Sequence, residues 1–198
     1  MRRITSTVNK QKHFPVDIKN RNTAPVVCIV GFSGAGKTTV TVGLVAALKQ
    51  RGLRVGTIKH DVHGFEVDRP GKDSWRHKQA GASATIISSP AQIGMVMDVG
   101  HDHQPLELVP LLGAMDIVLV EGFKRADLPK IEVFRPENKK PPACRDDRNL
   151  LAVVSDAQLD WSVPRYATDG CEGLAEFIVA HFRLNSLTIR GCEQSACG

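Results

Sequence analysis

The stretch VVCIVGFSGAGKTTV, residues 26–40, decides the fold of this chain. An apolar run leads into a glycine-rich loop, and a helix-forming segment follows. Gly31, four further residues, Gly36, Lys37 and Thr38 match a phosphate-binding loop, placed between a predicted strand and a predicted helix as the motif requires. The alternative is an ordinary glycine-rich turn, but the flanking pattern favours the phosphate loop.

A phosphate-binding loop gives its residues distinct roles. Glycines let backbone N–H groups turn inward around a polyphosphate, and the helix N-terminus adds its partial positive charge. Lys37 reaches the terminal phosphates, and the hydroxyl of Thr38 can ligate Mg²⁺. The sequence therefore predicts that this chain binds a nucleoside triphosphate.

Length and charge limit the other classes of function. The 198 residues suffice for one α/β domain with a buried parallel sheet and are few for two. The net charge of +5 lies in residues 1–23, which hold six basic residues against one acidic residue, so the remainder is neutral. Proteins that read nucleic acid concentrate basic charge on a folded face and stack bases on aromatic rings, which are scarce here. We expect no nucleic-acid partner.

The sequence also carries no targeting signal that we recognise. Residues 1–23 lack the apolar centre of a secretory signal, and no stretch approaches the about 18 apolar residues of a membrane span. We expect a cytoplasmic protein without membrane association. The five cysteines form an odd set without C-x-x-C spacing. Cys28 is expected to be a small buried hydrophobe, and Cys192 and Cys197 fall in a polar tail for which disorder is favoured over metal binding.

Strand-like and helix-like runs alternate along the chain, which is the pattern of a parallel sheet with crossover helices. We expect an α/β fold of the P-loop NTPase type, with a mostly parallel sheet flanked by helices. Its single domain covers residues 24–183, between a flexible basic leader, 1–23, and a disordered tail, 184–198. Strands are predicted over residues 26–30, 54–59, 117–120, 130–134 and 150–154, and helices over residues 37–51, 74–81, 106–112 and 172–182. Two further strands, 84–88 and 93–99, predict a β-hairpin insertion.

A second motif, MDIVLVEGF at residues 115–123, resembles a Walker B strand. In phosphate-loop enzymes an acidic residue at the tip of a neighbouring buried strand holds Mg²⁺ opposite the Ser or Thr of the loop. Glu121 is the best-placed carboxylate for this role, with Thr38 as its partner. The alternative is a surface glutamate at a strand end. Asp116, at the other end of the strand, is interpreted as a strand-initiating surface residue.

A third stretch, LLAVVSD at residues 150–156, bears on the choice of base. The carboxylate of Asp156, at the end of an apolar strand, could accept the N1–H and N2–H₂ donors that guanine presents and adenine does not. This favours GTP over ATP. An aspartate after a strand is also a common turn or N-cap residue, so both interpretations stay open.

The segment HDVHGFEVDRPGKD, residues 60–73, is too long for a bare connector and is a candidate functional loop. Its charged residues could bind an anionic ligand or move with the nucleotide state as a switch. A metal site is the alternative, but the segment is expected to be irregular and contains no cysteine, which favours a polar loop that faces phosphate. The residues considered are Lys59, His60, Asp61, His63, Asp68, Lys72, Asp73, Arg76 and His77.

Four ordered blocks carry a resemblance to a known family: GFSGAGKTT, TIKHDVHGFEVDRPGKDSWRHKQAGA, VLVEGFK and LPKIEVFR. Together they resemble molybdopterin-guanine dinucleotide biosynthesis protein B over residues 25–182. That family is similar to GTPases that act as metallocentre accessory factors. The resemblance implies binding of GTP with Mg²⁺, slow hydrolysis, a homodimer, and partnership with the guanylyltransferase that attaches GMP to molybdopterin, which is itself a possible ligand. Residue 32 is Phe, so the second lysine of the ParA/MinD-type loop is absent.

Carried over residue by residue, the resemblance assigns the phosphates to Gly31 to Thr39 and the Mg²⁺ site to Glu121, which the motif itself pairs with Thr38. The resemblance also implies an adjoining ligand region lined by Lys59, His60, Asp68, Lys72, Asp73 and Arg76. Lys37 and Glu121 would take part in catalysis, and Asp61 or Asp68 would position the nucleophile. Turnover should be slow, because no arginine finger or committed general base is evident. The nucleotide and ligand contacts expected are Gly31, Phe32, Ser33, Gly34, Ala35, Gly36, Lys37, Thr38, Thr39, Lys59, His60, Lys72, Asp73, Arg76 and Asp156.

Two other classes of function use the same features. An ATP-dependent small-molecule kinase or ligase could employ the phosphate loop and the strand-end glutamate, with residues 60–76 binding an acceptor. A non-enzymatic adaptor would use the nucleotide only to shape a surface for its partner.

Overall fold

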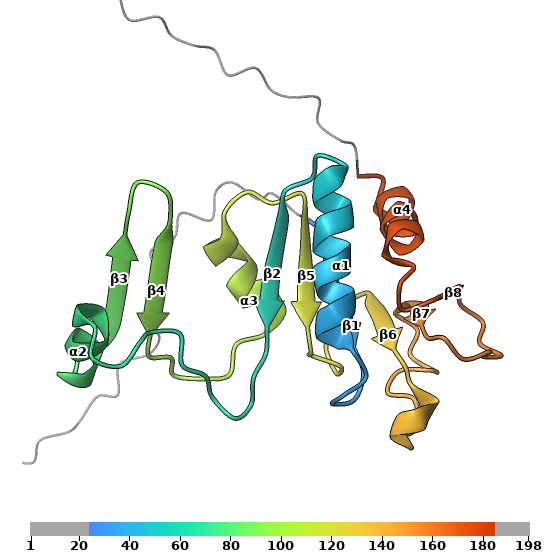
Figure 1. Cartoon of the computed structure of the whole chain (residues 1–198), viewed down its shortest axis with the longest axis horizontal. Coiled ribbons are helices and arrows are strands. Elements are labelled where there is room, and N and C mark those ends of the chain that lie inside the picture. The colour runs from blue at the N-terminus through green and yellow to red at the C-terminus, as the bar shows by residue number, and fades with distance from the viewer. Residues whose placement is uncertain (1–23, 185–198) are drawn as a thin grey trace, which may run out of the picture.

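The computed structural model describes residues 24–184, so the basic leader and the tail with Cys192 and Cys197 lie outside the described residues. A six-stranded sheet in the order β2-β5-β1-β6-β7-β8 forms its centre, with every strand pair parallel (Figure 1). The expected α/β fold of the P-loop NTPase type is confirmed. The strands are β1 (Val26–Val30), β2 (Val55–Lys59), β5 (Ile117–Glu121), β6 (Lys130–Val133), β7 (Leu150–Val154) and β8 (Arg165–Tyr166).

Helices connect and cover these strands. They are α1 (Lys37–Gln50), α2 (Asp73–Gln79), α3 (Pro105–Leu108) and α4 (Cys171–Phe182), with 3₁₀ turns η1 (Val109–Leu112) and η2 (Pro136–Asn138). The single helix predicted over residues 106–112 is therefore wrong in part, since α3 tightens into η1, where Pro110 has no N–H to donate. The pattern also missed β8, whose two residues are too few to show a strand period.

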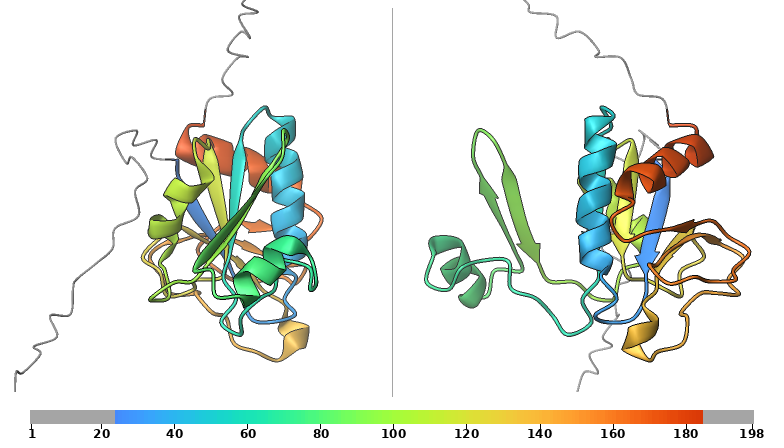
Figure 2. Two further views of the ribbon diagram at one scale, coloured as in Figure 1. Left: turned by 90° about the vertical axis from the view of Figure 1, so that its left-hand side faces the viewer. Right: turned by 45° about the vertical axis from the view of Figure 1, so that its right-hand side comes forward.

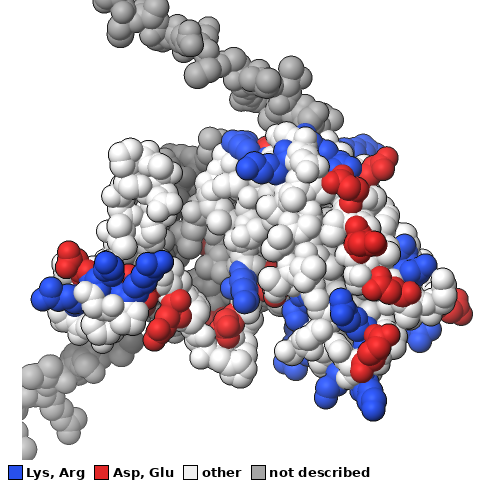
Figure 3. Space-filling view, in the orientation of Figure 1, with Lys and Arg blue, Asp and Glu red and all other residues white. Residues whose placement is uncertain are grey.

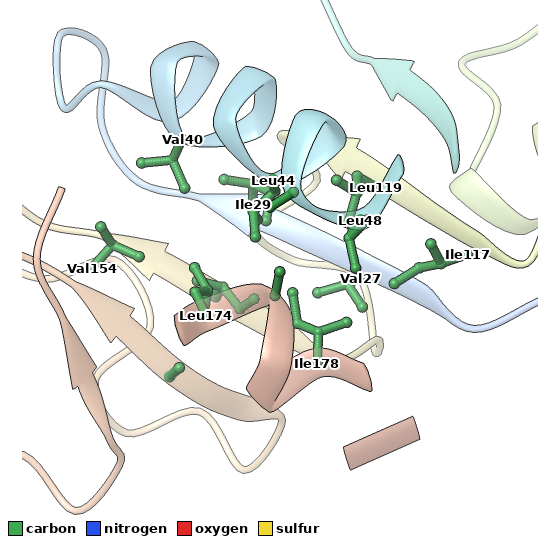
Figure 4. Packing of buried hydrophobic residues seen from close by; sticks show 14 of the residues in the cluster. Val27, Ile29, Val40, Leu44, Leu48, Ile117, Leu119, Val154, Leu174 and Ile178 are labelled. Carbon is green, nitrogen blue, oxygen red and sulfur yellow. The ribbon is translucent and has the colours of Figure 1, made fainter. Parts of the chain in front are cut away.

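The core lies on both faces of the sheet. β1 is buried along its whole length, and its successive side chains point to opposite faces. Val27 and Ile29 pack with Leu44 of α1 and Ile178 of α4 on one face, as Figure 4 shows. Cys28, on the other face, is a buried small hydrophobe as expected, and burial raises the pKa of its thiol to about 11.

The β-hairpin predicted from the sequence is confirmed as β3 (Ala84–Ser88) paired antiparallel with β4 (Ile93–Met97). β4 ends two residues earlier than predicted, where the N–H of Asp98 donates to the carbonyl of Ser83. The hairpin and α2 stand apart from the main sheet, on the side of β2 (Figures 1 and 2). Residues 60–72 lead from the end of β2 to this outlying unit.

Asp116, just before β5, ties two strand starts together. Its carboxylate accepts hydrogen bonds from the backbone N–H of Arg54 at 2.7 Å and from the guanidinium of Arg54 at 3.0 Å. These bonds, with the positive charge of Arg54, hold the pKa of Asp116 below its usual range. The residue is therefore an anchor between β2 and β5, at the edge of the sheet opposite the phosphate loop.

Two charged side chains lie buried in β6 and fix the segment that follows it. Lys130 and Glu132 are each 1% exposed. The ammonium of Lys130 lies 3.0 Å from a carboxylate oxygen of Asp147, and the carboxylate of Glu132 accepts the backbone N–H groups of Ala143 and Cys144. Burial raises the pKa of Glu132, while these two N–H donors oppose the shift. Residues 134–149 are thus held onto the sheet beside β1.

Candidate functional site

The phosphate loop connects β1 to α1 at the carboxyl ends of the central strands (Figure 1). Its path requires glycine at Gly31, where φ is +142° and a Cβ would lie 2.3 Å from the carbonyl oxygen of Val133. Gly36, with φ +95°, is the N-cap of α1. No side chain caps the helix, so the N–H groups of its first turn are free to bind an anion.

The structure brings together the two residues predicted to hold Mg²⁺. The hydroxyl of Thr38 donates to the carboxylate of Glu121, with oxygen–oxygen distances of 2.9 and 3.1 Å. The contact arises because β5 lies beside β1, so the tip of β5 meets the first turn of α1. Lys37 donates from Nζ to the carbonyl oxygen of Phe32 at 3.1 Å, which curls its side chain back over the loop. A hydroxyl, a carboxylate and an ammonium therefore converge at one edge of the sheet.

Lys59 and His60 extend this arrangement onto β2. Lys59 is exposed and lies in register with Glu121 on the neighbouring strand. The N–H of His60 donates to the carbonyl of Glu121 at 3.1 Å, and its ring stacks on Phe123 with centroids 4.3 Å apart. The Nε2 atom of His60 lies 3.0 Å from a carboxylate oxygen of Asp102. The imidazole is thus held between two partners next to the phosphate loop.

The other residues predicted to act near the nucleotide lie in two places, the segment after β2 and the start of α2. Asp61 lies two residues after the end of β2, and its carboxylate accepts the backbone N–H of His63 at 3.0 Å in a local turn. Asp68 makes a similar local bond to the N–H of Arg69 at 2.8 Å. Across residues 24–184, no three His, Cys, Asp or Glu side chains gather as a metal site would require.

Lys72, Asp73 and Arg76 lie at the start of α2, which packs against β3 in the outlying unit. Figures 1 and 2 both show α2 beyond the hairpin, apart from the phosphate loop. Arg76 is 3.8 Å from Asp73 within the same helix. The structure therefore does not gather these three residues with Lys37 and Glu121, and their contact with a ligand stays a prediction.

Asp156, the candidate for reading guanine, has a partner within the chain. Its carboxylate accepts the backbone N–H of Thr168 at 2.8 Å and the hydroxyl of Thr168 at 2.8 and 3.0 Å. These bonds hold the pKa of Asp156 below its usual range and link the end of β7 to the loop before α4. The residue lies at the same edge of the sheet as the phosphate loop because the strands are parallel. Its role toward a base stays a prediction.

Sequence reasoning missed the basic segment after β6. A Cβ placed on Gly36 would lie 3.3 Å from Nη2 of Arg135, and one placed on Gly34 would lie 3.9 Å from the side-chain nitrogen of Asn138. The only local signal was RPENKK directly after a predicted strand. Recognising it required the strand order, which puts β6 next to β1.

No helix among residues 24–184 has the length and apolar character that crossing a bilayer needs.

Comparisons with known proteins agree with this geometry. The family described as molybdopterin guanine dinucleotide synthesis protein B matches residues 26–156. The molybdopterin-guanine dinucleotide biosynthesis adapter protein of Escherichia coli is 38% identical over 161 residues, which cover 78% of this chain and 91% of that protein. The adapter protein of the same description from Haemophilus influenzae is 38% identical over 143 residues, covering 70% and 79%.

Solved structures give the same result. A crystal structure of molybdopterin-guanine biosynthesis protein B is similar with a TM-score of 0.61 and 32% identity, covering 80% of this chain and 99% of that one. The MobB protein of Bacillus subtilis is similar with a TM-score of 0.63 and 25% identity, covering 81% and 98%. The similarity therefore spans nearly the whole of each solved chain.

Proposed function

The chain belongs to the molybdopterin guanine dinucleotide synthesis protein B family, and on that premise we propose that it is a GTP-binding, slowly hydrolysing adapter protein in molybdenum cofactor biosynthesis. The observation that carries this proposal is the 2.9 Å contact between the hydroxyl of Thr38 and the carboxylate of Glu121. A phosphate loop and an acidic strand end that meet at this distance are the two halves of a nucleotide–Mg²⁺ site.

The residues of the loop suit a triphosphate. The backbone N–H groups of residues 34–38 would hold the β-phosphate, and Lys37 would exchange the carbonyl of Phe32 for phosphate oxygens. Thr38 and Glu121 would hold Mg²⁺, which when bound neutralises charge on the β- and γ-phosphates. Both side chains offer the hard oxygen ligands that this ion prefers.

Slow turnover follows from what surrounds the γ-phosphate position. Asp61 is the acidic side chain that follows β2 most closely, and it is engaged in a local turn with His63. Asp68 lines a cavity between α2 and the hairpin. Among residues 24–184 neither carboxylate has a contact with Lys37, so orienting a water molecule at the γ-phosphate would require residues 61–68 to rearrange. Hydrolysis that depends on such a rearrangement is expected to be slow.

The adapter role implies a partner, the guanylyltransferase that attaches GMP to molybdopterin. The relatives from E. coli and H. influenzae are described as adapter proteins of this biosynthesis. An adapter whose surface changes with its nucleotide would act on the transferase without carrying out the transfer itself. We place this partnership in the cytoplasm, with molybdopterin as a further possible ligand of the complex.

A homodimer is part of the proposal, and the outlying hairpin is its candidate interface. Ile86, Ile87 and Ile93 are more than half exposed, and Figure 3 shows this unit with few charged side chains above α2. An isolated two-stranded hairpin is marginally stable in water, so its apolar residues call for a partner surface. Sedimentation of the purified protein should give twice the monomer mass, and Ile93→Lys should shift it to the monomer. An unchanged mass in that variant would rule out this interface.

The nucleotide site is tested by calorimetric titration with GTP and ATP in Mg²⁺, using non-hydrolysable analogues. Lys37→Ala should abolish binding, whereas Lys49→Ala, at the far end of the same helix, should leave it unchanged. Wild-type affinity in Lys37→Ala would refute the phosphate-loop assignment. A preference for ATP, with consumption that depends on an added acceptor, would favour a kinase or ligase.

The non-enzymatic alternative needs a separate measurement. Glu121→Gln should remove hydrolysis while leaving the fold intact, because the amide keeps an acceptor for Thr38 but loses the charge that holds Mg²⁺. If complex formation with the transferase and GMP transfer remain normal in this variant, the protein acts as an adaptor for which hydrolysis is dispensable. If transfer fails, turnover is part of the function.

A further inference from the structure

Arg135 lies directly beside the phosphate loop, although it comes from a distant part of the sequence. We propose that it binds the phosphate chain of the nucleotide from within the same chain, as a ligand that the phosphate-loop motif does not include. The inference rests on the proposed nucleotide site. It adds to that site a guanidinium on the side of β6, opposite Glu121, which approaches from the side of β5.

The orientation of the guanidinium carries the argument. Measured from a Cβ built on Gly36, Nη2 lies at 3.3 Å, Nε at 3.6 Å and the central carbon Cζ at 3.7 Å. Both nitrogens are nearer than the carbon between them, so the edge that carries Nε and Nη2 is turned toward Gly36. That edge is the two-pronged donor with which arginine binds phosphate oxygens. Gly36 is the N-cap of α1, so the guanidinium lies beside a helix N-terminus that no side chain caps.

Arg135 is free to take a ligand. Its side chain is exposed, and among residues 24–184 no carboxylate lies within ion-pair distance of its guanidinium. Its positive charge acts on Asp156, whose pKa is lowered first by the bonds from Thr168 and to a lesser extent by Arg135. Arg135 follows β6, which lies between β1 and β7 in the sheet, so its guanidinium lies on the side of the phosphate loop that faces the end of β7.

Hydrogen bonds hold the segment that carries Arg135 in place. The N–H of Asn138 donates to the carbonyl of Arg135 at 3.1 Å in the 3₁₀ turn η2, and the buried carboxylate of Glu132 holds the backbone of residues 143 and 144 of the same segment. Asn138 and Lys140 line a small hollow together with Phe32 of the phosphate loop. In Figure 3, Lys and Arg side chains gather at the lower right, over the segment that follows β6.

This arrangement predicts a contact with phosphate that does not depend on the base. Two charge-assisted hydrogen bonds from one guanidinium would strengthen binding of GDP and GTP by about ten- to a hundredfold. The contribution should weaken as salt is added, because the side chain is exposed. Lysine at this position keeps the charge but lacks the two-pronged edge, so it should recover only part of the affinity.

The experiment compares four proteins by titration with GDP, a non-hydrolysable GTP analogue and a non-hydrolysable ATP analogue in Mg²⁺. They are the wild type, Arg135→Ala, Arg135→Lys and the control Arg145→Ala. Arg145 belongs to the same segment, and its guanidinium bonds to the carbonyl of Asp160. We expect Arg135→Ala to lose about ten- to a hundredfold in affinity for all three ligands, Arg135→Lys to lose less, and Arg145→Ala to stay within about twofold. Thermal melting checks that each variant folds, and Arg135→Lys serves if the alanine variant does not.

The outcomes separate this inference from the proposed function. If the wild type binds the nucleotides and Arg135→Ala binds them with the same affinity, the role of Arg135 is refuted and the proposed nucleotide site stands. A loss confined to the guanine ligands shows that Arg135 reads the base, which also overturns it. A wild type that binds none of the three ligands overturns the nucleotide site and the role of Arg135 with it.

Discussion

Replacing Gly31 by alanine should damage the phosphate loop more than any other single-methyl change in it. The added Cβ would lie 2.3 Å from the carbonyl oxygen of Val133, whereas ordinary contacts to carbon are about 3.5 Å, so the chain must open by roughly 1 Å. The carbonyl oxygen of Val133 belongs to the backbone, and the backbone of Gly31 fixes the position of a Cβ, so neither atom can rotate away where β1 and β6 pair. A φ of +142° adds strain of about 1–3 kcal/mol for a residue other than glycine.

Gly34 provides the matched control for this change. Its φ is +79°, but a Cβ there would meet nothing closer than 3.9 Å, so alanine costs only the left-handed backbone, about 1–2 kcal/mol. We therefore expect Gly31→Ala to lower the free energy of unfolding by about 3 kcal/mol or more, and to lower GTP affinity more than Gly34→Ala does. Urea denaturation and calorimetric titration measure the two quantities. Equal stability of the two variants would refute the close approach of β1 and β6 at this point.

Three further changes test other contacts of the site and its support. Thr38→Ala should weaken Mg²⁺-dependent GTP binding while Thr38→Ser retains it, because only the hydroxyl contacts Glu121; equal titrations would contradict the assignment. Asp147→Asn should cost about 1–3 kcal/mol in urea denaturation by leaving the ammonium of Lys130 without its carboxylate, and should cost little in a Lys130→Met background. Burial raises the pKa of Glu132, so the folded state binds this proton more tightly than the unfolded state does, and the free energy of unfolding falls as the pH rises from below 4.5 through the raised pKa. Glu132→Gln should remove that fall from the pH profile of the free energy of unfolding. Parallel profiles for the wild type and the variant would show that the carboxylate titrates normally.

The sequence predicted the parts of this fold that depend on local pattern. The buried strands β1, β5 and β7 appear as short apolar runs, and each ends within a residue of its predicted limit. The contact between Thr38 and Glu121 could also be anticipated, because phosphate-loop proteins place the acidic strand beside the loop strand. In both cases the information lies in short motifs, each a few consecutive residues long.

The composition of β6 was harder to interpret. KIEV alternates charged and apolar residues, a pattern typical of a strand with one face in water. In the structure both Lys130 and Glu132 are buried, because residues 134–149 cover that face and supply the partners that the charges need. A segment that looked like an ordinary polar loop therefore decides the burial of a strand, and nothing in the strand itself reveals this.

The candidate site shows the same limit. Lys59 and His60 could be placed near Glu121 from their position at the end of a strand. Arg135 could not, because its approach to Gly36 depends on β6 being the neighbour of β1, a pairing between strands about 100 residues apart. The resemblance predicted Lys72 near the ligand, but Lys72 lies at the start of α2, which packs against the hairpin. A single sequence does not reveal which distant strands pair with each other or which path a long loop takes.

The hydrogen bonds seen at the phosphate loop also bear on how a nucleotide would enter it. Lys37 is bonded to the carbonyl of Phe32, and the hydroxyl of Thr38 to Glu121. A bound nucleotide would take Lys37 from the carbonyl of Phe32, and Mg²⁺ held by both Thr38 and Glu121 would replace the hydrogen bond between them. The two bonds satisfy polar groups of the loop before a ligand binds, which stabilises the loop with its glycine turns. Nucleotide binding must then break both bonds, which reduces the net free energy of binding. Among residues 24–184 the guanidinium of Arg135 pairs with no carboxylate, so a phosphate could engage it without breaking such a bond, and it is suited to make an early contact.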